Sequence, residues 1–212
     1  MNSDEWWHNP CGPYTLVDTP KNVDVIEFSQ MDLYKLLEHY RDCRSKAYDT
    51  FGSWTLRRAP TLTDYYTGFE TYPWLPDVPN LMITYFADKR LFKDVKLEVL
   101  ISKFYQHFQI YAAALTFLAS EENVQGTDQV FQFKSVELQK ALCWHSRLMK
   151  VNKINFLPPP RKTIIPTELY PFKLNLEGRF NREYIIYTNY INILDYFVQV
   201  LEYFTKTTHF FV

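Results

Sequence analysis

The 212-residue chain has a length typical of one domain and enough apolar side chains, at 47% of residues, to bury a core. Its 23 basic and 24 acidic residues leave a net charge of -1, which gives no electrostatic basis for binding nucleic acid or an anionic membrane. No apolar run approaches the ~20 residues that a membrane-spanning helix requires. We therefore expect one domain over residues 1–212, with no nucleic-acid partner and no membrane insertion.

The N-terminal segment, residues 1–18, is polar and carries Trp6 and Trp7. It lacks the basic start and the apolar stretch of a secretory signal peptide. Three interpretations stay open: a cytosolic protein, a mature chain behind an added methionine, or a protein exported by an unconventional route.

Three cysteines, Cys11, Cys43 and Cys143, allow one disulfide and one free thiol. Cys43 lies on the apolar stripe of the first predicted helix, where a buried thiol is expected. A bond from Cys43 to Cys11 or to Cys143 is the alternative, so the sequence leaves the pairing open.

The first predicted helix covers residues 29–51. Ser29 and Asp32 suit its N-terminal cap, and Gly52 suits its end. Apolar and charged side chains alternate with helical spacing, as in an amphipathic helix. The apolar stripe consists of Leu33, Leu36, Leu37, Tyr40, Cys43, Ala47 and Phe51.

Residues 53–80 contain four prolines, three of them within one short stretch, which excludes a regular helix there. The interleaved aromatic side chains argue against disorder. We expect a long ordered loop packed on the helices. Trp54 and Trp74 are expected either to anchor this loop in the core or to contact a partner.

Three further helices are predicted over residues 88–122, 128–153 and 179–207. A short turn at 123–127 joins the first two, and a proline-bearing connection at 156–177 precedes the last.

The lengths of the connections predict the topology. A helix of about 25 residues is ~37 Å long, and an extended return over that length needs about 12 residues or more. The first and third connections exceed this length, so they can join parallel helices, whereas the short turn can join only antiparallel neighbours. We therefore predict an all-α, up-up-down-down, long-chain four-helix bundle with two long crossover loops.

No catalytic motif of weight occurs in the sequence. With 5 glycines, the chain has no glycine-rich phosphate loop, and the motifs of serine hydrolases and zinc peptidases are missing. Cys143 and His145 are two residues apart on a predicted helix and so do not face each other. His107 and His145 are expected to be structural. We predict no enzymatic activity, no cofactor and no metal site.

The first helix reads Asp32-Leu33-Tyr34-Lys35-Leu36-Leu37-Glu38-His39. This run resembles the first helix of the neurotrophic branch of the interleukin-6 superfamily, which includes cardiotrophin-like cytokine and ciliary neurotrophic factor. In the last helix, Phe180 is followed at the offsets typical of that branch by Tyr187, Tyr190, Ile193 and Tyr196. The family has Phe-x-x-Lys at this start, whereas this chain has Glu183 in the lysine position and Arg182 before it. At the position where the family has a tryptophan, this chain has Tyr196.

The resemblance implies three receptor-binding surfaces on one bundle. The start of the last helix with part of the first long loop would form one, with Phe180, Arg182 and Glu183. The exposed faces of the first and third helices would form the second. The end of the last helix with the first long loop would form the third. The remaining candidates are Arg41, Arg44 and Arg147 on the second surface and Trp54 and Trp74 in the loop.

These implications favour a secreted cytokine-like growth factor that clusters cell-surface cytokine receptor chains and activates JAK–STAT signalling. A co-secreted soluble receptor is a further partner that the family allows. The alternative function is an intracellular or viral all-α protein-interaction module without catalysis, which would agree with the lack of a signal peptide.

Overall fold

The computed structural model describes residues 3–12, 29–62, 72–76, 96–125, 132–158 and 176–207. All regular structure in these ranges is helical, which confirms the predicted all-α class. The elements are a short 3-10 helix, η1 (Ser3–His8), and the four long helices α1 (Gln30–Leu62), α3 (Leu97–Gln125), α4 (Gln132–Val151) and α5 (Leu176–Thr207).

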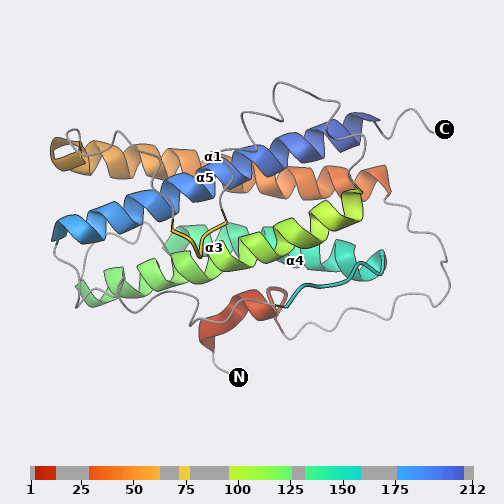
Figure 1. The fold of residues 1–212 in the computed structure, drawn as a ribbon, viewed down its shortest axis with the longest axis horizontal. Helices are drawn as coiled ribbons and strands as arrows, with labels where there is room; N and C mark the ends of the chain where they lie inside the picture. Colours follow the sequence, from red (N-terminus) through yellow and green to blue (C-terminus); the bar gives the residue numbers. More distant parts are fainter. Residues whose placement is uncertain are drawn as a thin grey trace.

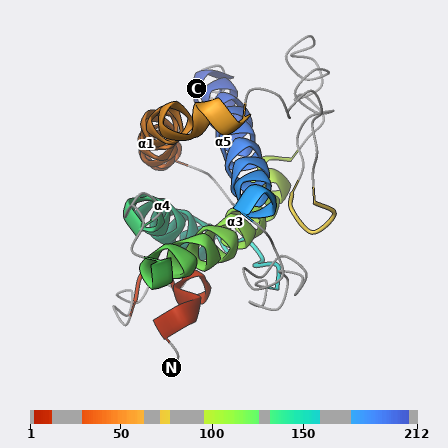
Figure 2. The same ribbon diagram turned by 90° about the vertical axis from the view of Figure 1, so that its left-hand side faces the viewer.

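The four long helices form an up-up-down-down bundle. Residue numbers increase in one direction along α1 and α3 and in the opposite direction along α4 and α5 (Figure 1). Seen from the end, α1 lies beside α4 and α5, and α3 lies across from α1 (Figure 2). Every helix therefore packs on antiparallel neighbours. The connections at 63–96 and 152–175 each join two parallel helices, as the loop lengths predicted.

The start of α1 agrees with prediction, but its end does not. The Ser29 hydroxyl accepts a hydrogen bond of 3.1 Å from the Asp32 amide, which caps the helix. The helix does not end at Gly52 but continues to Leu62. Phe51 stacks on Tyr187 of α5 at 5.5 Å, so packing holds the helix together at this point. That contact outweighs the roughly 1 kcal/mol that a helical glycine costs relative to alanine.

The other helix boundaries also shift. Lys96 is not helical, so α3 begins at Leu97 rather than at 88, although residues 88–95 lie outside the described ranges. It runs on to Gln125, through part of the predicted turn at 123–127. Helix α4 covers Gln132–Val151, whereas the prediction was 128–153; residues 128–131 lie outside the described ranges. Helix α5 starts at Leu176, three residues earlier than 179.

Helix α4 ends in a Schellman motif. Lys153 has a φ of 53°, in the left-handed region. Its amide bonds the carbonyl of Lys150 at 3.2 Å, and the amide of Ile154 bonds the carbonyl of Met149 at 2.9 Å. Ile154 is buried, which supplies the apolar contact common in this motif. The motif stops α4 two residues before the predicted end.

Replacing Lys153 with glycine should raise the free energy of unfolding by about 1 kcal/mol, because glycine adopts a positive φ without the steric cost that a Cβ imposes. Chemical denaturation at pH 7 measures the change. Replacement with valine, which is β-branched and disfavours this conformation, is the matched control and should destabilise. Equal stability of the two variants would contradict this account of the helix end.

The centre of the bundle is aromatic and contains one buried histidine. His145 stacks on Phe197 at 5.6 Å, and the Tyr40 ring lies against Phe108 at 4.5 Å. His145 Nε2 donates to the Ile101 carbonyl at 2.9 Å, so Nδ1 is left to accept the Tyr40 hydroxyl at 2.8 Å. Both ring nitrogens are satisfied, which fits the expected structural role. Burial lowers the pKa of His145 to about 3.

One disulfide and one free thiol are present, as the cysteine count allowed. Cys11 is bonded to Cys143 on α4 across a sequence separation of 132 residues. Cys43 is buried and free, in agreement with its place on the apolar stripe. Burial raises the pKa of the Cys43 thiol well above its usual range.

The disulfide holds the N-terminal segment, residues 3–12, against α3 and α4. We call this segment the N-terminal strap. Trp7 is fully buried, and its carbonyl accepts a 2.7 Å hydrogen bond from the Gln109 amide. The Trp6 indole N–H donates to the Thr116 hydroxyl at 3.0 Å. The strap therefore forms part of the fold despite its polar composition.

Candidate functional site

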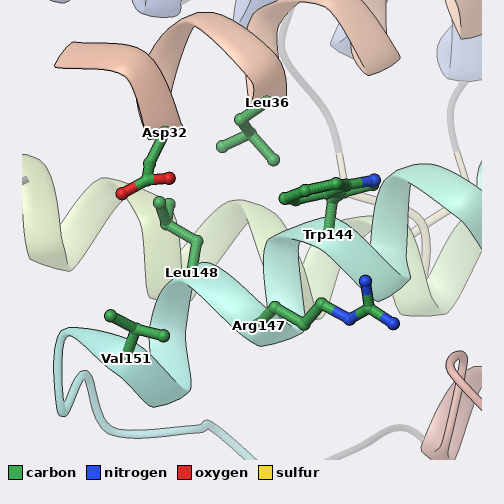
Figure 3. Close-up of a pocket in the computed structure, with 6 residues that line it drawn as sticks. All are labelled: Asp32, Leu36, Trp144, Arg147, Leu148 and Val151. Atoms are coloured by element: carbon green, nitrogen blue, oxygen red, sulfur yellow. The ribbon is translucent and has the colours of Figure 1, made fainter. Parts of the chain in front are cut away.

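A pocket of about 140 Å³ lies between α1 and α4 (Figure 3). Its floor is apolar, with an aspartate at one end and an arginine beside a tryptophan at the other. The lining residues are Asp32, Leu36, Trp144, Arg147, Leu148 and Val151. An apolar pocket with opposite charges at its two ends suits an apolar side chain flanked by charged groups.

Helical spacing brings these residues together. On α4, positions 140, 144, 147 and 151 recur every three or four residues and so form one stripe. Trp144 is half-buried on this stripe, and Val151 remains 57% exposed. Asp32 and Leu36 sit one turn apart on α1 and complete the opposite wall.

Three basic side chains surround the Trp144 ring. The Lys35 ammonium and the Arg147 guanidinium each lie 5.6 Å from the ring centroid, a cation–π distance. The His39 ring stacks on the indole at 5.4 Å. Burial lowers the pKa of His39 below its usual value. We call Lys35, His39, Trp144 and Arg147 the Trp144 cluster.

Within the described residues, no carboxylate lies within 4 Å of Lys35 or Arg147. The Asp32 carboxylate, at the far end of the pocket, accepts a hydrogen bond from the Ser29 hydroxyl at 2.5 Å. The Trp144 indole, which both cations approach, lines the pocket together with Arg147.

Arg41 and Arg44 do not belong to this surface. Arg41 pairs with Glu202 of α5 at 2.6 Å, and Arg44 lies 3.8 Å from Asp195 of α5. Both point to the α1/α5 seam, whereas Arg147 lies at the α1/α4 pocket. The expectation that the three arginines share one surface is therefore wrong, because positions 41 and 44 turn away from the face of α1 that meets α4.

The start of α5 places its three candidates in different environments. Arg182 is fully buried, with its guanidinium 5.3 Å from the Phe117 ring centroid and 4.0 Å from the Glu183 carboxylate. It cannot be the exposed contact that the resemblance implied. Phe180 is partly buried, and the Glu183 side chain is 13% exposed. These two residues remain candidates.

The two tryptophans predicted to lie in the first long loop, Trp54 and Trp74, lie in different elements. Trp54 lies in α1 rather than in a loop, and its side chain is outside the described residues. Trp74 is partly buried and stacks on Tyr72 at 5.8 Å. The Tyr111 hydroxyl donates to the Pro76 carbonyl at 2.7 Å, which fixes residues 72–76 on the bundle. The ordered, packed loop is confirmed for these five residues.

Trp144, Lys35 and His39 were not predicted as site residues from the sequence. A signal was present: Trp144 lies off the apolar stripe that His145 and Met149 share, and a tryptophan outside a core stripe is more often exposed for binding. Recognising the surface also needed the α1/α4 pairing, because Lys35 and His39 are far from Trp144 in sequence.

The chain has no counterpart in any of three comparisons: no family model, no curated protein and no solved structure matches it. Among the described helices, none is long and apolar enough to cross a membrane.

Proposed function

We propose that this protein is a secreted cytokine-like ligand that clusters cell-surface receptor chains and activates JAK–STAT signalling. The observation that carries the proposal is the up-up-down-down arrangement of α1, α3, α4 and α5 with its two long crossovers. This topology is typical of growth-hormone-type cytokine bundles, whereas up-down-up-down bundles need no long connection.

The disulfide gives independent support for secretion. Cys11 and Cys143 are bonded, and such structural bonds persist in oxidising compartments but are rare in the cytosol. Three free thiols, measured under blocking conditions in protein from its native source, would contradict secretion and favour an intracellular interaction module.

We propose two receptor surfaces on this bundle. The first is the α1/α4 pocket with the Trp144 cluster, whose tryptophan and arginine are residue types enriched at binding hot spots. Its expected occupant is an apolar receptor side chain beside a carboxylate that meets Lys35 and Arg147. The second is the start of α5, with Phe180 and Glu183. The surfaces lie on different sides of the bundle, so one ligand can bring two receptor chains together.

Binding to a panel of receptor extracellular domains tests the proposal. Purified full-length protein, with its disulfide intact, should bind at least one receptor chain of the interleukin-6-type class in surface plasmon resonance. The panel includes soluble receptors as co-ligands. Cells that carry the bound chains should then show STAT phosphorylation. No binding across the panel by folded protein would refute the proposal.

A further inference from the structure

The face of α3 and α4 beneath the N-terminal strap has the features of a peptide-binding surface. We propose that the strap is an exchangeable peptide ligand of this face, and that reduction of the Cys11–Cys143 disulfide by a dithiol opens the face. The proposal does not depend on cytokine activity.

Side chains of the helices hold the strap mainly through its backbone. The amide of Gln109 on α3 donates to the Trp7 carbonyl at 2.7 Å. The amide of Gln139 on α4 donates to the Pro10 carbonyl at 3.2 Å. Glutamine side-chain amides on two helices thus bind two backbone carbonyls of the strap, one in its 3-10 helix and one in the turn that follows.

Trp7 and Trp6 supply the side-chain part of the recognition. Trp7 is fully buried and belongs to the apolar core, whereas Trp6 is partly exposed and donates its indole N–H to the Thr116 hydroxyl. Thr116 and Gln109 lie on one face of α3. Trp7 is therefore the anchor of the strap.

The disulfide is accessible enough to act as a latch. Cys11 and Cys143 are both partly exposed, whereas Cys43 is buried. A dithiol thiolate can attack one sulfur of the bond, and its second thiol then resolves the mixed disulfide. The dithiol loses two electrons and two protons and becomes a disulfide, while Cys11 and Cys143 each gain a thiol hydrogen.

Hydrogen exchange on the full-length protein tests the latch. In Cys11→Ser, the amides of Asn9 and Gly12, which are hydrogen-bonded within the strap, should exchange roughly tenfold faster or more than in the wild type. Amides in α1 and α5 should keep their protection. Cys43→Ala, which leaves the latch intact, is the matched control and should keep the strap protected. Wild-type protein treated with a dithiol should behave as Cys11→Ser does.

A synthetic peptide of residues 3–12, with Cys11 replaced by serine, tests the surface. It should bind Cys11→Ser protein and slow the hydrogen exchange of the amides around Gln109 and Thr116. It should not bind oxidised wild-type protein. The same peptide with Trp7→Ala should lose at least tenfold in affinity, and more than the peptide with Trp6→Ala. A strap that stays protected in Cys11→Ser would overturn the proposal. Loss of protection throughout α1 and α5 would also overturn it, because the release would not be local.

Discussion

Acidification from pH 7 to pH 5 should lower the free energy of unfolding by about 2 kcal/mol through His145 alone. Burial lowers the pKa of this ring to about 3, below its usual value of 6.5. The unfolded state therefore binds a proton between these values while the folded state does not. The stability that the neutral His145 ring contributes is fully present above pH 6.5 and is lost as the pH falls toward 3.

The surroundings of His145 do not offset this effect. The Tyr40 hydroxyl donates to the ring, and the pKa of Tyr40 is raised by burial. Tyr105 packs edge-on at 5.2 Å, and burial raises its pKa to about 12. Both phenols stay neutral throughout the acid range. His107, with a pKa lowered to about 4 by burial and by Lys103, acts in the same direction.

Urea unfolding of wild type, His145→Gln and His39→Gln at pH 7 and pH 5 measures the effect. His145→Gln should be less stable at pH 7 but should lose about 2 kcal/mol less on acidification, because glutamine does not titrate. His39→Gln is the matched control from the bundle surface and should keep most of the wild-type pH dependence. An unchanged pH dependence in His145→Gln would contradict the assignment of the proton to this ring.

The topology could be predicted because it depends on chain lengths. Residues 123–127 are too few to cross a helix, whereas 53–80 and 156–177 are long enough. The corrections arise where tertiary contacts override local preference. Gly52 is a helix terminator by local rules. Phe51 nevertheless packs on Tyr187, and α1 continues beyond Gly52 to Leu62.

The candidate site was predicted only in part, because its residues come from two helices. Arg147 was expected at a binding surface from the family resemblance, but Trp144, whose ring it contacts, was not. Arg182 was expected at the surface by resemblance, yet it is buried against Phe117. The Cys11–Cys143 pairing depends on where Trp7 packs, and no local pattern in the strap indicates that it docks on α3 and α4.

Trp144→Ala should weaken binding to the receptor chain that we propose docks at the α1/α4 surface by about 30-fold or more, a loss of at least about 2 kcal/mol typical of a hot-spot tryptophan. The substitution removes the ring that forms one wall of the pocket and the support on which Lys35 and Arg147 lie. Because Trp144 is only half-buried, the bundle should stay folded, as circular dichroism can check.

Matched variants separate this surface from the rest of the bundle. Tyr34→Ala removes another exposed aromatic ring, 47% accessible, from the side of α1 away from the pocket, and should bind as the wild type does. Arg147→Ala should weaken binding less than Trp144→Ala and should reduce its salt dependence, because the contact with an acidic receptor group is electrostatic. A receptor at the start of α5 should be unaffected by either α4 change. Equal losses for Trp144→Ala and Tyr34→Ala would place the contact elsewhere, since only Trp144 lines the pocket.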